Sequence, residues 1–144
     1  MDLAADGSVE LEAPARWANT PPVPDGQLDD PCWQGVPTQT QVVRAAGDAL
    51  ATLPTTFWVA YDTSALYFAA EVVTEKADLI EAGQTERDNG RILTHDESVL
   101  VSSFFEGQQM EFGVNSKGTL YDALGGQTSW NPQWTAAVLK TEKG

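Results

Sequence analysis

Hydrophobic and polar residues alternate in several short stretches of the chain, a pattern typical of β-strands. The clearest stretches are Thr55–Tyr61 (TTFWVAY) and 66–73 (LYFAAEVV), which are rich in β-branched and aromatic residues. The polar residues 62–65 (DTSA) separate them. Two such runs joined by a short polar turn predict a β-hairpin.

A second hairpin is predicted further along the chain. Ser98–Phe105 and 109–115 flank a turn at Glu106 and Gly107. The apolar positions that mark the buried face of its second strand are Met110, Phe112 and Val114. Weaker patterns predict short strands at 8–12, 38–44, 119–121 and 134–140, a loop or helical turn at 45–52, and one helical turn at 77–82. Short strands with almost no helical periodicity predict an all-β sandwich or barrel.

The chain is strongly acidic. Its 144 residues include 21 Asp and Glu against 8 Lys and Arg, which gives a formal net charge of −13. That charge repels phosphate backbones and anionic lipid headgroups, so nucleic acids and membrane surfaces are excluded as partners. It suits calcium, which takes oxygen ligands, although solubility is the simpler explanation. A hydrophobic content of 42% predicts one folded domain with one core.

The single cysteine and the single histidine limit the available chemistry. Cys32 cannot form an internal disulfide and, between Pro31 and Trp33, is expected to be a small buried apolar residue. One cysteine and one histidine also exclude a zinc site built from several such ligands. The chain has no G-x-S-x-G motif, and His95 and Asp96 would point to opposite faces of a strand. The sequence therefore does not predict an enzyme.

Five tryptophans in a chain of this length suggest a binding surface for sugars. Indole faces stack on the apolar faces of sugar rings, while polar neighbours bind the hydroxyl groups. Trp130 and Trp134 flank Asn131 and Pro132, where a loop enters the last predicted strand. Packing in the core or at its rim is the alternative role for both tryptophans.

Five segments of the chain follow a recognisable order. They are PPVPDGQLDDPCW, WVAYDTSALYFAAEV, ERDNGRILTHDESVLV, MEFGVNSKGTLYD and WNPQWTAAVLKTEKG, between residues 21 and 144. Together they resemble the family 9 carbohydrate-binding modules and their DOMON-like relatives, in the variant found in large bacterial exported or cell-envelope proteins. The resemblance implies a jelly-roll-type antiparallel β-sandwich over 21–144, with 1–20 as an N-terminal extension or edge strand. It also implies an extracellular or cell-envelope location.

The same resemblance gives a role to the segment VPDGQLDDPCW. We interpret it as a fold-forming corner rather than a metal or stacking site. Asp25 and Gly26 are predicted to make a turn, and Trp33 to pack inward. Asp29 and Asp30 are predicted to cap the short turn that follows them.

The residues that bind sugar in the family are replaced in this chain. Leu93 and Thr94 stand where members carry one of two clamping tryptophans, and the other clamping tryptophan lies in a C-terminal part that is missing here. Leu100 and Gly113 stand in place of a glutamate and an arginine. A sugar site is therefore expected to use other residues, namely Arg91, His95, Trp130 and Trp134. Relatives often carry structural calcium, for which Asp88 and Asp96 are the candidate ligands.

Three functions follow from the resemblance. The first is a non-catalytic carbohydrate-binding module that tethers a larger secreted protein to a polysaccharide or oligosaccharide. The alternative is a structural or interaction module of an envelope protein, with no sugar ligand. The third is haem binding through Met110 and His95, for which core packing of Met110 is the alternative.

The C-terminal end of the sequence also departs from the family. Members continue with a G-W-x-x-E-x-x-I-P motif and further strands, whereas this sequence ends at Gly144, on the first residue of that motif. The chain is therefore expected to be a fragment with an open sheet edge. It would complete itself as a homodimer or with a strand from residues 1–16. No apolar run is long enough for membrane insertion, and 1–17 lacks the features of a signal peptide.

Overall fold

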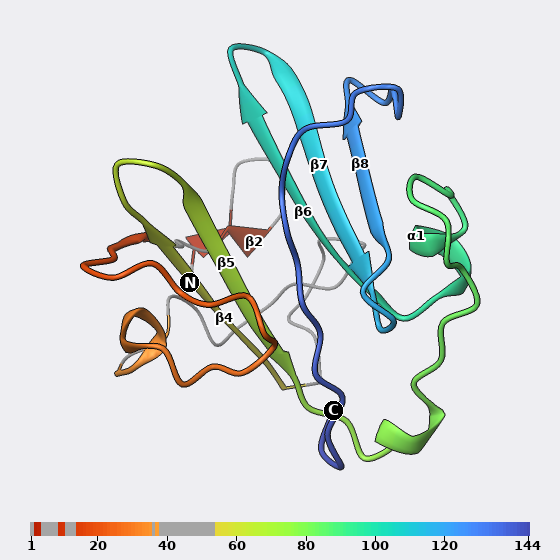
Figure 1. The fold of residues 1–144 in the computed structure, drawn as a ribbon, viewed down its shortest axis with the longest axis horizontal. Coiled ribbons are helices and arrows are strands. Elements are labelled where there is room, and N and C mark those ends of the chain that lie inside the picture. Colours follow the sequence, from red (N-terminus) through yellow and green to blue (C-terminus); the bar gives the residue numbers. More distant parts are fainter. Residues whose placement is uncertain (1, 4–8, 11–13, 36, 38–53) are drawn as a thin grey trace. The chain divides into compact units, whose positions relative to one another are not determined.

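The protein is built almost entirely from β-strands, as a computed structural model shows (Figure 1). The structure describes residues 2–3, 9–10, 14–35, 37 and 54–144. The strands are β1 (Asp2–Leu3), β2 (Val9–Glu10), β3 (Arg16–Trp17), β4 (Thr55–Tyr61), β5 (Leu66–Val72), β6 (Ser98–Phe105), β7 (Gln108–Asn115) and β8 (Leu120–Leu124). Single helical turns are η1 (Pro31–Trp33), η2 (Ala77–Leu79) and α1 (Ile92–His95). The predicted all-β class is confirmed.

The chain divides into two compact units. The N-terminal unit comprises Met1–Val23, Gln27–Ala77 and Lys143–Gly144, and the C-terminal unit comprises Pro24–Gly26 and Asp78–Glu142. The sheet β3-β4-β5 belongs to the first unit and the sheet β6-β7-β8 to the second. A two-stranded antiparallel pair, β1-β2, accounts for the remaining strands. In the described residues, no helix has the length and apolar character needed to cross a membrane.

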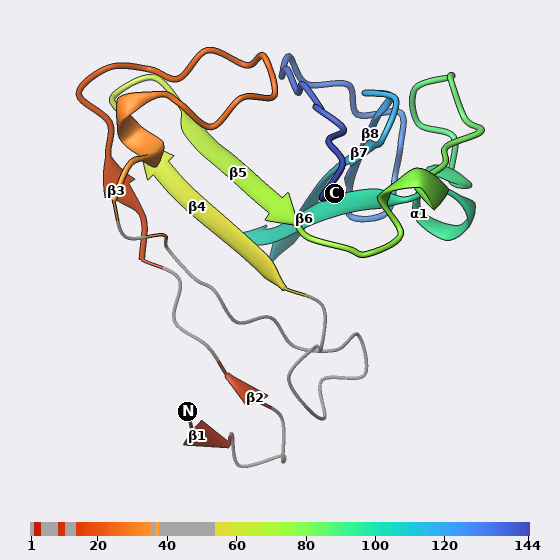
Figure 2. The ribbon, with the colours of Figure 1, turned by 90° about the horizontal axis from the view of Figure 1, so that it is seen from below.

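The hairpin β4–β5 forms as predicted, in the N-terminal unit (Figure 2). Its turn is closed by the Asp62 carboxylate, which accepts hydrogen bonds from the backbone N–H groups of Ser64 (2.7 Å) and Ala65 (3.0 Å). The hydroxyl of Tyr67 donates to the other carboxylate oxygen at 2.8 Å. These donors, the Ser64 N–H first, lower the pKa of Asp62 because they stabilise its charged form. The strand β3 pairs in parallel with β4.

The core of the N-terminal unit forms on one face of this sheet. Trp33 packs against Ala18 and Ala60, and all three are buried. Half-buried neighbours complete the cluster: Leu28, Cys32, Trp58, Tyr67 and Ala69. The predicted inward packing of Trp33 is therefore confirmed. Burial raises the pKa of the Cys32 thiol, because desolvation disfavours the thiolate.

The predicted capping of the short turn is wrong. Asp30 stands at the N-cap of η1, but its side chain makes no capping hydrogen bond. Its Oδ1 instead accepts the backbone N–H of Val23 at 3.2 Å. The turn is closed by backbone groups, since the N–H of Trp33 donates to the carbonyl of Asp30 at 3.0 Å. The carboxylate is thus used to bring the preceding strand-like segment against the turn.

The hairpin β6–β7 is confirmed in the C-terminal unit, and β8 adds to it on the other side of β7. Both turn residues have positive φ, 49° at Glu106 and 79° at Gly107. Two successive left-handed residues give the tight two-residue loop whose twist matches that of the strands. The predicted turn at Asp25 and Gly26 also forms. Gly26 has φ 85°, and a Cβ there would lie 2.8 Å from the backbone nitrogen of Leu139.

The predicted buried face of β7 needs correction. Met110, Phe112 and Val114 share one face, as alternation requires, but they are only half-buried. The buried positions of β7 are Gly113 and Asn115, on the opposite face. The reason is α1, which packs Ile92 and Leu93 against Tyr121 and Ala123 of β8. α1 therefore buries the Gly113 face of the sheet where it packs on β8.

The predicted last strand is wrong. Residues 134–140 form no strand, although they lie within the described chain. Trp134 contacts Phe112, which lies on the middle strand β7. The segment thus crosses the face of the sheet instead of extending its edge, and so makes no ladder of hydrogen bonds (Figure 1). The predicted elements at 38–44 and 45–52 lie outside the described residues.

Substituting Trp33→Ala should lower the free energy of unfolding by about 3–5 kcal/mol, because it leaves a cavity at the centre of the N-terminal core. Chemical denaturation measures this change. The matched control is Trp17→Ala, since Trp17 is 52% exposed and makes an edge-to-face contact with Tyr61. It should cost about 1 kcal/mol. Equal losses in the two variants would contradict the assigned core.

Candidate functional site

The C-terminal unit brings chemistry-bearing side chains together at two places. We call the first the aromatic face, made of Phe112, Trp130 and Trp134. We call the second the hollow, a cavity of about 540 Å³ lined by residues 80–84, His95, Asp96, Ser116, Lys117 and Lys140. Each is held in place by the hydrogen bonds of one carboxylate, Asp122 at the aromatic face and Asp96 at the hollow.

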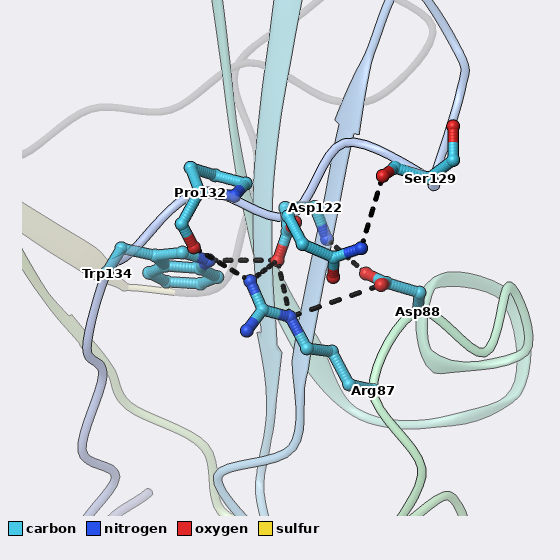
Figure 3. A network of polar contacts seen from close by, with 7 residues as sticks. Arg87, Asp88, Asp122, Ser129, Pro132 and Trp134 are labelled. Atoms are coloured by element: carbon cyan, nitrogen blue, oxygen red, sulfur yellow. Dashed lines mark hydrogen bonds and ion pairs between the residues drawn. The ribbon is translucent and has the colours of Figure 1, made fainter.

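Asp122 is completely buried on β8, directly opposite Phe112 of β7. Its Oδ2 accepts hydrogen bonds from Arg87 through Nε (3.0 Å) and Nη2 (2.6 Å), and from the indole nitrogen of Trp134 (2.9 Å) (Figure 3). The same Nη2 donates to the carbonyl of Pro132 at 3.0 Å. One carboxylate oxygen therefore joins the loop before α1, the sheet and the C-terminal segment.

The residue next to Arg87 reinforces this junction. Asp88 has φ 63°, a left-handed conformation that non-glycine residues rarely adopt. In this conformation its Oδ1 accepts the backbone N–H of Asp122 at 2.9 Å, and its own N–H donates to the carbonyl of Leu120 at 3.0 Å. The strained residue thus binds the loop to the outer side of β8.

The aromatic face is a set of edge-to-face ring contacts. Phe112 lies 5.6 Å from Trp130 and 5.3 Å from Trp134 between ring centroids, with interplanar angles of 64° and 79°. Such geometry is favoured by the ring quadrupoles. The ring of Trp134 contacts Phe112 and its indole N–H donates to Asp122, so this side chain stabilises the fold. Trp130 is half-buried, and part of its surface remains open.

The floor of the hollow is fixed by Asp96. Its Oδ1 accepts the backbone N–H of Gly83 at 2.8 Å, and its Oδ2 accepts the N–H of Gln84 (3.1 Å) and the side-chain amide of Asn115 (2.8 Å). The Gly83 N–H is the main reason that the pKa of Asp96 is lowered, and the charge of Lys117 adds to the effect.

Asn115 continues the same network inward. It is buried, and its Oδ1 accepts the backbone N–H groups of Lys117 (3.0 Å) and Thr119 (2.9 Å). Its amide also donates to the carbonyl of Gln84 at 2.8 Å. The loop 83–84 and the turn after β7 are therefore held in one position by a pair of polar side chains.

The four predicted sugar residues lie at three different places. Trp130 and Trp134 meet at the aromatic face, and His95 lines the hollow. Arg91 is exposed at the start of α1 and is not part of the lining. Their assignment to a sugar site stays a prediction.

Sequence reasoning missed the two lysines of the hollow. Lys140 donates to the carbonyl of Ile80, at 3.0 Å and 60 residues away along the chain. No local motif joins residues at that separation. The only available signal was the scarcity of lysine and arginine in this acidic chain, which makes each basic residue worth placing.

The predicted calcium ligands, Asp88 and Asp96, both accept hydrogen bonds within the fold. Both oxygens of Asp96 and Oδ1 of Asp88 accept N–H donors. Among the described residues, no three His, Cys, Asp or Glu side chains are grouped to hold a metal. Calcium binding stays a prediction.

The predicted haem pair does not fit one haem. Met110 shares the face of β7 that carries Phe112, because residues two apart in a strand point the same way. His95 belongs to α1, which packs on the opposite face through Ile92 and Leu93. The sheet therefore separates the two side chains, and no step is assigned to haem.

Comparisons with protein-family models, with curated proteins and with solved structures found no match for this chain. The resemblance noted in the sequence is therefore an expectation, and the geometry of the C-terminal unit carries the functional argument.

Substituting Arg87→Met should lower the free energy of unfolding by about 3–5 kcal/mol, because it leaves the buried Asp122 carboxylate without its cation. Chemical denaturation measures the loss. The double variant Arg87→Met, Asp122→Asn should recover part of it, because the charge is then removed as well. Arg91→Met is the matched control and should change stability by no more than about 0.5 kcal/mol. A similar loss in both single variants would contradict the role of the ion pair.

The lowered pKa of Asp96 makes a prediction about pH. A carboxylate whose pKa is lower in the folded state stabilises the fold above its unfolded pKa, and this stability is lost as pH falls through the folded pKa. The Asp96→Asn variant lacks this carboxylate, so it has no such pH-dependent contribution to lose. The stability difference between wild type and variant should therefore shrink as pH falls from neutral into the acidic range, in parallel denaturation series. A difference that is constant with pH would contradict the assignment.

Proposed function

We propose that the chain is a non-catalytic carbohydrate-binding module that tethers a larger secreted or cell-envelope protein to a polysaccharide. In this proposal its two sheets form a jelly-roll-type sandwich. The observation that carries the proposal is the hollow. A cavity of about 540 Å³ is within the range of small-ligand sites.

The lining of the hollow suits sugar hydroxyl groups, which both donate and accept hydrogen bonds. Ammonium groups and a histidine supply donors, and the Glu81 carboxylate and the Ser116 hydroxyl supply acceptors. The floor is immobilised by Asp96 and Asn115, so little conformational entropy is lost on binding. Because the Asp96 oxygens are already occupied by N–H donors, the arrangement favours recognition over proton transfer.

The aromatic face offers a second contact. The half-buried ring of Trp130 is held edge-on by Phe112 and supplies a preorganised apolar surface. Stacking on a sugar would use its exposed part. Trp134 has no such freedom, because its indole N–H is bound to the buried Asp122.

A second candidate function is an interaction module that forms homodimers. The observation in its favour is the tip of the β6–β7 hairpin, where Phe104 is 75% and Phe105 is 63% exposed. Exposed aromatic pairs of this kind are costly in water and mark contact surfaces. β6 is also an edge strand in the described part of its sheet, which allows strand addition.

A panel of soluble and insoluble glycans, with calcium or with EDTA, tests the proposed function. The protein should bind at least one glycan of the panel. Trp130→Ala should then weaken its binding by about 1–3 kcal/mol if the ring is a stacking anchor, and His95→Ala should weaken it if the hollow is occupied. Trp17→Ala, on the N-terminal unit, is the control and should bind like wild type.

The outcomes separate the two functions. No retention of any glycan, together with concentration-dependent dimerisation in sedimentation that Phe104→Ser abolishes, would replace the carbohydrate module with the interaction module. Retention that differs between calcium and EDTA would support the predicted structural calcium. Equal binding of all variants to a retained glycan would place the sugar at neither site.

A further inference from the structure

The hollow brings two lysines together in a protein that has few basic residues. The chain carries 8 Lys and Arg against 21 Asp and Glu. Two of those eight, Lys117 and Lys140, line the hollow together with the sole histidine, His95. With Glu81 and Asp96 in the same lining, basic and acidic side chains are equal in number there, whereas acidic residues outnumber basic ones in the chain as a whole.

Neither lysine is neutralised by the fold. Within the described residues, neither Lys117 nor Lys140 lies within ion-pair distance of a carboxylate. The Nζ of Lys140 donates one hydrogen bond, to the carbonyl of Ile80 at 3.0 Å. An ammonium group has three N–H donors, so two remain for a ligand. The bond to Ile80 holds the side chain along one wall of the hollow.

The two carboxylates of the lining differ in how their oxygens are used. Asp96 keeps its charge and interacts with Lys117, but its oxygens accept hydrogen bonds from three N–H groups, of Gly83, Gln84 and Asn115. Glu81 is exposed and is the remaining carboxylate in the lining. The hydrogen-bonding capacity of Asp96 is therefore used within the fold, while the ammonium groups keep N–H donors for an added anion. Beyond about 8 Å, physiological salt screens the net negative charge of the rest of the protein.

We propose that the hollow binds sugar rings that carry one anionic group, a carboxylate or a sulfate ester, with Lys117 and Lys140 as the residues that recognise it. The inference rests on the proposed carbohydrate-binding function and names the substrate class of the same site. Charge-assisted hydrogen bonds from the ammonium groups hold the anion, and the neutral donors and acceptors of the lining hold the hydroxyl groups.

The experiment is a titration of the 144-residue chain with three matched ligands at physiological ionic strength. They are a galacturonate trisaccharide, its methyl ester, and a sulfated trisaccharide of the same length. Wild type should bind the galacturonate or the sulfated ligand at least about 10-fold more tightly than the neutral ester, the scale of one charge-assisted hydrogen bond. The ligand that binds more tightly shows whether the recognised anionic group is a carboxylate or a sulfate ester.

Variants assign the preference to the hollow. Lys117→Gln and Lys140→Gln should each remove most of it, while Glu81→Gln should strengthen acid binding because it removes the opposing charge. Lys117→Gln is informative even if Lys140→Gln disturbs the wall through its bond to Ile80. The matched control is Lys76→Gln, an exposed lysine of the N-terminal unit, which should leave the preference unchanged.

Two results would overturn the inference. Equal binding of the acid and its ester, unaffected by either lysine variant, would leave a carbohydrate-binding module with no selectivity for acidic sugars. Absence of binding to all three ligands and to every glycan of the panel would remove the proposed function and the inference together.

Discussion

The C-terminal unit depends on one requirement, that the buried carboxylate of Asp122 be satisfied. Moving an isolated carboxylate out of water costs several kcal/mol even after relaxation, so its partners must come to it. Arg87 arrives from the loop before α1, and Trp134 from the segment after β8. Both donate to the same oxygen, Oδ2, while Oδ1 is buried without a partner among the described residues. The cost of that unpaired oxygen, about 1–3 kcal/mol, is offset by the three hydrogen bonds that Oδ2 accepts from Arg87 and Trp134.

This requirement explains why the segment 134–140 is not a strand. Its residues have a composition that suits a sheet, yet Trp134 is held over the middle strand by its indole N–H and its ring. A chain fixed above the face of a sheet cannot also pair with the edge. The same anchor brings Lys140, six residues later, to the loop 80–84 and so forms one wall of the hollow. A buried ion pair thereby determines where a surface site lies.

The parts of the fold that could be predicted are those decided locally. Both hairpins follow from alternation and turn residues within about 20 residues of sequence. Trp33 packs inward because burial removes its large apolar ring from water. The wrong predictions concern residues for which two different parts of the chain compete as contact partners. Asp30 has a capping position but binds Val23 instead, and the face of β7 marked by Phe112 is less buried than the face under α1. Neither outcome can be predicted from a local sequence pattern, because each depends on which other segment of the chain packs against the residue.

The hollow shows the same limit at the level of function. The sequence directs attention to aromatic residues and carboxylates, yet Trp134 and Asp96 are both consumed by the fold. What they leave available is the set of groups that form no salt bridge among the described residues. In a chain with a net charge of −13, a lysine without a salt bridge is a more specific signal than an aspartate, since every acidic residue already has solubility as its explanation. Which groups a protein does not use for its own stability is decided only by the fold, and those groups are the ones it can offer to a ligand.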